Sequence, residues 1–199
     1  ALPIWFGNWL ENLVDWNLSR SRYWGTPLPI WRTEDGSEEL CFGSVEDLVQ
    51  ALQTALSSGK LSEAQTKGNE AFIAAVKAGE ADLHRPYVDN IFVLSTSGTV
   101  MGRESDLIDV WFDSGAMPFA QWHYPFENQE IFKQSYPADF ISEGVDQTRG
   151  WFFTLHAISA MVEESVAFKN VVSTGLVLDK NGNKMSKRLG NAIDPFDTL

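Results

Sequence analysis

Two lysines three positions apart form the most chemically suggestive pattern in the sequence. Lys184 and Lys187 enclose Met185 and Ser186, shortly after an Asn181-Gly182 dipeptide. Such a dipeptide between two apolar pieces is a strong signal for a tight turn. Two ammonium groups on a short loop can close over a polyphosphate and neutralise the charge that builds there during nucleotidyl transfer. A solvated basic turn is the ordinary alternative, and the charges alone do not decide between them.

A second candidate site lies where a short apolar strand, expected over residues 138–141, meets a polar turn. The turn carries Glu143, Gly144, Asp146 and Gln147. In doubly wound sheets, ligands bind outside the carboxyl ends of the strands. Gly144 permits a ligand to approach the backbone, and the Asp146 carboxylate can accept two hydrogen bonds from a ribose diol. Capping of the helix expected over residues 148–162 explains the same acidic residues equally well.

The elements that must position these residues follow from periodicity and from cap residues. Apolar residues at three- and four-residue spacing predict a helix over residues 5–18. Ser44 is typical of a helix N-cap, whereas the small and polar stretch 57–69 predicts a loop. Alternating apolar residues predict strands over 87–94 and 107–112. The order strand, turn, helix and strand after residue 138 favours an α/β fold with a parallel sheet.

Composition and charge bound the answer further. The 199 residues carry 15 basic and 27 acidic side chains, and the formal net charge of −12 disfavours a uniformly basic nucleic-acid-binding surface. The stretch 33–106 is strongly acidic, and we expect it to be an insertion in a host domain. The sequence has no apolar run of ~18 residues, so no membrane span is expected. Cys41 is the single cysteine, which excludes an internal disulfide and favours a reducing compartment.

Three segments together resemble one protein family. Lys184-Met185-Ser186-Lys187 resembles the KMSKS loop of class I aminoacyl-tRNA synthetases, although Arg188 stands where the family usually has serine. Residues 137–153 resemble the adenylate-binding strand and turn of the isoleucyl, valyl and leucyl synthetases, and are most similar to the isoleucyl type. Residues 109–115 resemble the Val-Trp-Phe-x-Ser-Gly segment of the isoleucyl type. Residues 18–31 also resemble that type, in the segment that returns to the catalytic domain.

The resemblance implies a role for each matching residue. Lys184 and Lys187 would be catalytic, acting on the ATP phosphates, and Met185 and Ser186 would bind ATP with them. Glu143, Gly144, Asp146 and Gln147 would bind the adenylate and its ribose, with Gln147 toward the amino acid. Trp111 and Trp151 would form two aromatic walls of the isoleucine pocket, with Gln147 one helical turn before Trp151. Taken alone, Trp111 is more simply explained by core packing.

The implied fold is the second half of a Rossmann-like parallel-sheet catalytic domain with an acidic α+β insertion. Residues 1–32 would return to that domain, residues 33–106 would be the insertion, and residues 107–199 would be the C-terminal half with the loop. The intact enzyme would be a cytoplasmic monomer with no membrane contact. It would use ATP and Mg²⁺ to activate isoleucine and would transfer it to tRNA(Ile).

This sequence also differs from the family pattern in two other ways. Many relatives have cysteine pairs near residues 33–36 and 95–97, where this chain has Thr33 to Gly36 and Ser95 to Ser97, so we expect no zinc and no other metal site. None of the three histidines fits a His-x-Gly-His motif, so we expect the chain to be an inactive piece of a larger enzyme. A valyl or leucyl synthetase fragment remains an alternative. So does a non-catalytic nucleotide-binding or interaction module derived from a synthetase.

Overall fold

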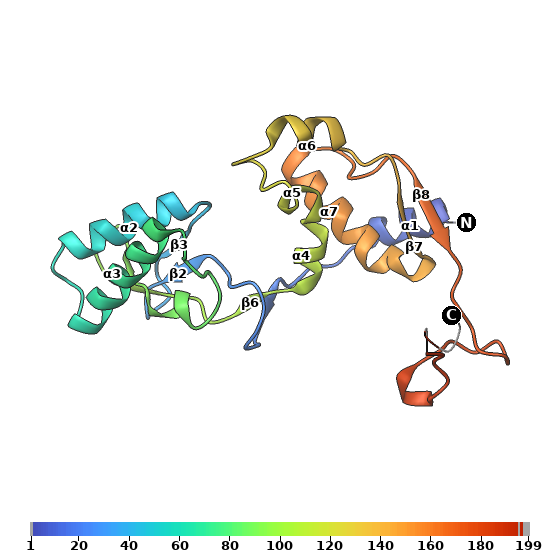
Figure 1. Ribbon diagram of the computed structural model, residues 1–199, viewed down its shortest axis with the longest axis horizontal. Helices are drawn as coiled ribbons and strands as arrows, with labels where there is room; N and C mark the ends of the chain where they lie inside the picture. The colour runs from blue at the N-terminus through green and yellow to red at the C-terminus, as the bar shows by residue number, and fades with distance from the viewer. Residues whose placement is uncertain (1, 195, 197–199) are drawn as a thin grey trace. The chain divides into compact units, whose positions relative to one another are not determined.

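The computed structural model describes residues 2–194 and 196, and the chain divides into two compact units. The parallel-sheet unit comprises Ala1–Asp15 and Ser114–Leu199, and the antiparallel-sheet unit comprises Trp16–Asp113. Both units combine helices with strands (Figure 1), so the fold is mixed α/β. The domain boundaries expected near residues 32 and 106 stay predictions. Within the described residues, no helix is long and apolar enough to span a membrane.

A four-stranded antiparallel sheet organises the antiparallel-sheet unit. Its strand order is β3–β2–β5–β4, formed by β3 (Glu39–Cys41), β2 (Ile30–Arg32), β5 (Val100–Arg103) and β4 (Val93–Leu94). Helices α2 (Val45–Ser57) and α3 (Glu63–Ala78) and the 3₁₀ helix η1 (Tyr87–Asn90) accompany it.

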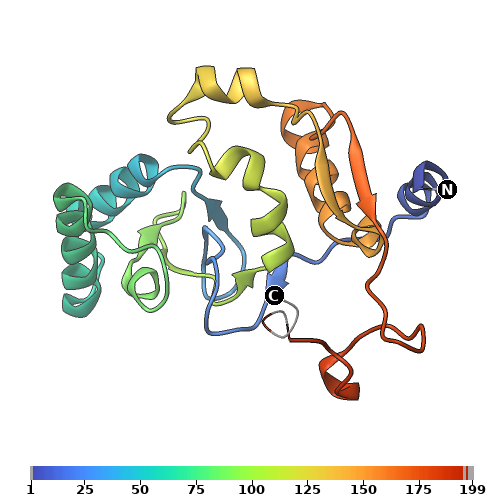
Figure 2. The ribbon, with the colours of Figure 1, turned by 45° about the vertical axis from the view of Figure 1, so that its right-hand side comes forward.

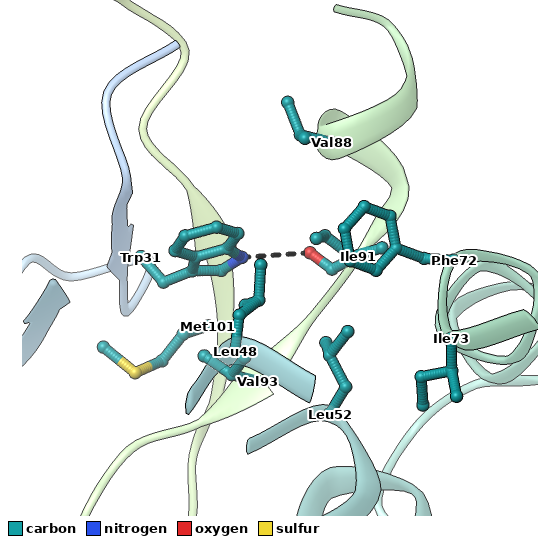
Figure 3. Packing of buried hydrophobic residues seen from close by; sticks show 9 residues of the cluster. All are labelled: Trp31, Leu48, Leu52, Phe72, Ile73, Val88, Ile91, Val93 and Met101. Atoms are coloured by element: carbon teal, nitrogen blue, oxygen red, sulfur yellow. Dashed lines mark hydrogen bonds between the residues drawn. The ribbon is translucent and has the colours of Figure 1, made fainter. Parts of the chain in front are cut away.

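The sheet, the two helices and η1 all contribute side chains to the core of this unit. The buried Trp31 belongs to it and donates its indole N–H to the Ile91 carbonyl oxygen at 3.2 Å (Figure 3). The buried side chains come from strands, helices and η1, and they are Trp31, Leu48, Leu52, Phe72, Ile73, Val88, Ile91, Val93 and Met101. Because the indole N–H finds a backbone partner, its burial leaves no unpaired donor.

Helix starts in this unit are set by serine caps. The Ser44 hydroxyl accepts from the Asp47 N–H and begins α2, which confirms the predicted N-cap. Ser62 and Gln65 form a reciprocal capping box that begins α3 at Glu63. The loop predicted over residues 57–69 is therefore wrong beyond Ser62, because the polar residues there form the first turns of a helix. Gly79 ends α3 in the left-handed conformation, with φ of 71°.

Three other predictions need correction. The predicted helix over 5–18 is shorter, since α1 covers Leu2–Glu11 and the later residues lead into β1 (Ser19–Arg20). The predicted strand over 87–94 is η1 followed by the short β4. The predicted strand over 107–112 is β6 (Leu107–Ile108), paired antiparallel with β1, and then helix α4 (Val110–Gly115).

The parallel-sheet unit contains one strand–helix–strand motif. Strand β7 (Ile141–Gly144) leads through the 3₁₀ helix η2 (Val145–Arg149) into helix α7 (Trp151–Glu163), and β8 (Val171–Thr174) returns parallel to β7. Figure 2 shows the two strands side by side with α7 along them. The expected parallel sheet is thus present, but it has two strands among the described residues.

Packing around α7 holds this unit together. Phe152 and Leu155 of α7 are buried with Ile141 of β7 and with Ala167. Helix α1 packs on the same helix through edge-to-face contacts, between Trp9 and Phe153 and between Phe6 and His156. Short helices α5 (Met117–Ala120) and α6 (Gln129–Ser135) contribute a separate aromatic cluster, whose members are Phe119, Tyr124, Phe132 and Tyr136.

Candidate functional site

The first part of the candidate site is the carboxyl edge of the parallel strands. Glu143 pairs with Ser173 and Gly144 pairs with Thr174, so both strands end together. The structure extends β7 through Gly144, so the predicted turn begins three residues later than expected. Ser173 and Thr174 were not singled out from the sequence. Their position before Gly175, at the end of an apolar segment, was the available signal.

Gly144 and Asp146 lie unusually close at this edge. A Cβ placed on Gly144 would stand 2.6 Å from an Asp146 carboxylate oxygen, below the closest approach of real Cβ atoms. The φ of Gly144 is −64°, a value that other residues adopt readily. Glycine is therefore favoured here by the space over the backbone and not by its conformation. The absent side chain lets the exposed Asp146 carboxylate lie against the strand end.

Gln147 and Trp151 are joined through the backbone at the start of α7. The Gln147 side-chain oxygen accepts from the Trp151 backbone N–H at 3.0 Å. It therefore satisfies one of the N–H groups that a helix start leaves without an intrahelical partner. The Trp151 indole donates to the Ser114 carbonyl oxygen at 3.0 Å, which fixes the ring orientation. The arrangement brings the two predicted pocket residues together, with Gln147 in a capping role.

Trp111, the other predicted pocket wall, belongs to the antiparallel-sheet unit. Its side chain is 43% exposed, which does not fit plain core packing. Asp109, which is 5% exposed, anchors the start of this helix. Its carboxylate accepts from the Trp111 backbone N–H at 3.3 Å and from Arg20 at 2.7 Å, and also from the Trp16 indole at 3.0 Å. Sequence reasoning missed Asp109, although an acidic residue just before a helix is a recognisable cap signal.

The second part of the candidate site is the basic loop after β8. Leu178 forms an antiparallel bridge with Lys184, and Gly182 donates to the Asp179 carbonyl oxygen at 2.9 Å. Gly182 has a φ of 79°, which favours glycine, so the predicted turn at Asn181-Gly182 is confirmed. Lys184 is exposed.

The rest of the predicted loop motif follows this hairpin. Met185 and Ser186 are half-buried, and the Ser186 hydroxyl accepts from the Leu189 N–H at 3.2 Å. Lys187 begins the 3₁₀ helix η3 (Lys187–Leu189), and its side chain lies outside the described part of the structure.

Asp179 organises this loop, and it too was missed from the sequence. Its carboxylate accepts from the Asn191 amide at 3.0 Å and from the backbone N–H groups of Asn183 and Asn181 at 2.8 and 2.9 Å. These donors lower the pKa of Asp179 to about 2. An anion with three donors is favoured in its charged form, so Asp179 stays ionised at neutral pH.

Hydrogen bonds to Glu38 join the turn after β2 to the segment 95–97, the two places considered above for a cysteine-ligated zinc. The Glu38 carboxylate accepts from the hydroxyls of Ser97 and Thr96, and from the Ser97 backbone N–H at 3.3 Å. These bonds lower the pKa of Glu38 from 4.5 to about 2. Within the described residues, no three His, Cys, Asp or Glu side chains are grouped to hold a metal ion. The expected absence of zinc stays a prediction.

Comparison with known proteins places these features in a family. A sequence profile described as tRNA synthetases class I (I, L, M and V) matches residues 4–199. The chain is 67% identical over 194 residues to an isoleucine--tRNA ligase of Cytophaga hutchinsonii, a match covering 98% of this chain and 16% of that protein. The corresponding ligase of Bacteroides fragilis is 64% identical over 200 residues, and that of Thermus thermophilus is 49% identical over 194 residues. The chain is thus homologous to isoleucine--tRNA ligases over nearly its whole length, and it spans about one sixth of theirs.

A solved structure supports the fold. The leucyl enzyme of Agrobacterium radiobacter K84, solved as a ternary complex with tRNA and LeuAMS, matches 98% of this chain and 24% of that one, with a TM-score of 0.58. At 20% identity this likeness bears on the fold alone. The sequence profile covers more than nine tenths of the residues, and it includes both the strand edge and the basic loop. The chain belongs to the class I tRNA synthetases, in the family of the isoleucyl, leucyl, methionyl and valyl enzymes.

Proposed function

We propose that this chain is a fragment of an isoleucine–tRNA ligase that contains the adenylate-binding half of its catalytic domain. The observation that carries the proposal is the 67% and 64% identity to isoleucine--tRNA ligases over 98% of the chain. In finer terms, the parallel-sheet unit would be the second half of a Rossmann-like domain. The acidic antiparallel-sheet unit would contain the whole insertion over residues 33–106. The intact enzyme would be a cytoplasmic monomer that uses isoleucine, ATP with Mg²⁺, and tRNA(Ile).

The chemistry needs no covalent nucleophile from the protein. The isoleucine carboxylate attacks the α-phosphate of ATP, the bond from that phosphorus to the bridging oxygen breaks, and pyrophosphate leaves with the electron pair. Isoleucyl-adenylate remains. A hydroxyl group of the tRNA then attacks its acyl carbon, the bond from that carbon to the phosphate oxygen breaks, and AMP leaves. The protein contributes positioning and stabilisation of the charge that develops on the phosphates.

The strand edge is suited to hold the adenylate. Glu143 and Asp146 present carboxylates at the end of β7, and Asp146 lies directly over Gly144. A carboxylate in that position can accept hydrogen bonds from both ribose hydroxyls. Gly144 leaves the backbone accessible to the nucleotide. In the proposed complex, Gln147 lies toward the amino acid, and Trp151 contacts its aliphatic side chain. The pocket role expected for Trp111 stays a prediction. Large rings with few polar atoms suit a branched apolar substrate.

The basic loop is suited to act on the leaving phosphates. Lys184 is exposed on a hairpin, and Lys187 follows on the next turn. Two ammonium groups there would neutralise charge on the β- and γ-phosphates as pyrophosphate forms. Met185 and Ser186 would bind ATP with the two lysines. Both the strand edge and the loop belong to the parallel-sheet unit, so one unit would carry the proposed ribose-binding and phosphate-binding residues of this chain.

Amino-acid-dependent ATP–pyrophosphate exchange by the full-length gene product tests the proposal. We expect exchange with isoleucine and much weaker exchange with valine and leucine. Exchange that prefers valine or leucine would instead support the valyl or leucyl alternative. A properly folded full-length protein with no exchange for any of the three amino acids would favour the non-catalytic module.

A further inference from the structure

The basic loop is closed by a side-chain pair that its family resemblance does not assign. Asp179 stands before the Lys184–Lys187 segment and Asn191 stands after it. The Asn191 amide nitrogen donates to the Asp179 carboxylate at 3.0 Å, across twelve residues of chain. Both residues are half-buried. Of the other residues between 172 and 194 whose burial the structure describes, Met185 and Ser186 are also half-buried and the rest are exposed.

Each member of the pair also holds part of the loop backbone. The second carboxylate oxygen of Asp179 accepts from the N–H groups of Asn181 and Asn183 and so shapes the turn. The Asn191 side-chain oxygen accepts from the Ser186 N–H at 2.9 Å, and its amide nitrogen also approaches the Lys184 carbonyl oxygen at 3.4 Å. The pair therefore contacts the backbone on both sides of Lys184.

Apolar packing offers this segment little support. Leu178 is 47% exposed, and Leu189 is 64% exposed. A loop without buried apolar side chains is held by its hydrogen bonds, and it opens locally when they are lost. The conformation of the loop thus depends on the Asp179–Asn191 pair and on the backbone groups that it binds.

We propose that Asp179 and Asn191 are positioning residues that hold the Lys184–Lys187 segment in the conformation from which its lysines reach the ATP phosphates. The proposal rests on the proposed function above, and neither residue needs to touch the substrate. Loosening the pair lowers the fraction of enzyme with a competent loop. Since the lysines act on charge that develops in the transition state, the loss falls mainly on kcat, and the KM for ATP changes less.

The pair permits a reciprocal exchange that separates positioning from simple damage. Asp179→Asn turns an amide nitrogen toward that of Asn191, and flipping the Asn191 amide would set its nitrogen against the Ser186 N–H. Asn191→Asp brings two carboxylates together. The double variant restores the hydrogen bond between the two side chains in reverse and gives up the long contact of position 191 with the Lys184 carbonyl oxygen. The amide at position 179 accepts from the turn N–H groups and donates to the carboxylate at position 191, which still accepts from Ser186.

The experiment measures isoleucine-dependent pyrophosphate exchange by the full-length protein, together with amide hydrogen exchange over residues 181–191. We expect each single variant to lower kcat about tenfold, the loss of about one charge-assisted hydrogen bond, with the KM for ATP changed less than about threefold. Both single variants should also speed amide exchange in the loop. The double variant should recover both readouts to near the wild-type values. Lys180→Ala, an exposed change on the same turn, is the matched control and should leave both unchanged.

Three results would overturn the proposal. Single variants with wild-type kcat and wild-type amide exchange would remove the role of the pair. A double variant as impaired as the single variants combined would show that the two side chains do not act through each other. Single variants that change the KM for ATP and leave kcat intact would point to ground-state binding instead. If the wild-type protein shows no pyrophosphate exchange, the proposed function fails, and amide exchange alone then decides whether the pair holds the loop.

Discussion

At the scale of single residues, Gly144 allows the Asp146 carboxylate to lie against the end of β7. Its hydrogen atom occupies the space that a methyl group would need, 2.6 Å from an Asp146 oxygen. The Asp146 side chain is flexible, so a larger residue can be accommodated by moving that carboxylate away. The fold would survive the change, whereas the geometry proposed for ribose recognition would not.

Gly144→Ala should therefore weaken nucleotide binding without unfolding the protein. We expect about a tenfold weaker affinity for a non-hydrolysable isoleucyl-adenylate analogue in the full-length protein, the cost of about one hydrogen bond to a charged group. Isothermal titration calorimetry measures it. Gly43→Ala is the matched control, because its added Cβ meets nothing within 4 Å. Equal affinities for the wild type and Gly144→Ala would show that Asp146 does not hold the ribose where we propose.

The residues that stand in recognisable motifs could be predicted from the sequence, whereas the long-range partners of the residues that position them could not. Lys184 stands in a segment whose lysine spacing indicates phosphate binding, and Gly144 stands in a turn whose residue types indicate nucleotide binding. Asp109, Asp179 and Asn191 act through partners far along the chain. The Asp109 carboxylate binds Arg20 across 89 residues, and Asp179 binds Asn191 across 12. No local pattern encodes such partners, because they become neighbours only after the chain has folded.

At the scale of elements, α3 depends on its capping box. The Ser62 hydroxyl accepts from the Gln65 N–H while the Gln65 side chain accepts from the Ser62 N–H. Ser62→Ala removes one of these bonds and should destabilise the chain by about 1 kcal/mol. Thermal unfolding should show a melting temperature lowered by about 2–4 °C. Ser62→Asp keeps a capping oxygen and should melt close to the wild type. An unchanged melting temperature for Ser62→Ala would mean that the box contributes nothing to α3.

The contact between Glu38 and the turn at Ser97 predicts a pH dependence. The pKa of Glu38 is lowered from 4.5 to about 2 by hydroxyl and backbone donors. A carboxyl with a lowered pKa in the folded state adds stability above its ordinary pKa, and that stability is lost as the pH falls. We expect the wild type to lose stability between about pH 5 and pH 2, and Glu38→Gln to lose less over that range. Thermal unfolding against pH measures it, with exposed Glu34→Gln as control. Parallel pH profiles for Glu38→Gln and the wild type would contradict this account.

The predicted ends of helices and strands are wrong where partners far along the chain compete with the local periodicity of the sequence. The aromatic spacing that predicts a helix to residue 18 continues past Glu11, but Trp16 instead donates to Asp109, 93 residues away. Alternation over 107–112 resembles a strand, yet Asp109 caps a helix there and leaves two residues for β6. The start of α2 was predictable because its cap is local. The start of α3 also has a serine N-cap, Ser62, but the polar residues around it predict a loop.

At the scale of the whole molecule, the two units have separate cores, and both are net acidic, while basic side chains gather in the loop after β8. The acidic stretch 33–106 lies entirely within the antiparallel-sheet unit, whereas the basic loop lies in the parallel-sheet unit. The net charge of −12 therefore does not describe the basic loop, which we propose faces the ATP phosphates. The basic loop and the carboxyl edge of the strands are where the account expects ATP and the adenylate.

The stability of the whole protein should not depend on a bound metal ion. If hydrogen bonds to Glu38 replace a cysteine knuckle, a chelator should have nothing to remove from the antiparallel-sheet unit. Treating the protein with EDTA should leave its melting temperature unchanged to within about 1 °C, since a structural zinc ion contributes directly to folding. Elemental analysis of the same sample provides the control. A lower melting temperature together with stoichiometric zinc release would contradict the expectation of no zinc.

We propose that Lys184 and Lys187 act on the ATP phosphates during the formation of isoleucyl-adenylate. The most direct test is isoleucine-dependent pyrophosphate exchange by the full-length protein carrying Lys184→Ala and Lys187→Ala. We predict a loss of kcat of at least about a hundredfold with the fold retained, because two charges would no longer stabilise the departing pyrophosphate. Lys133→Ala with Lys180→Ala, which removes two positive charges elsewhere in the same unit, should retain near-normal exchange. Normal exchange in the Lys184 and Lys187 double variant would contradict the account.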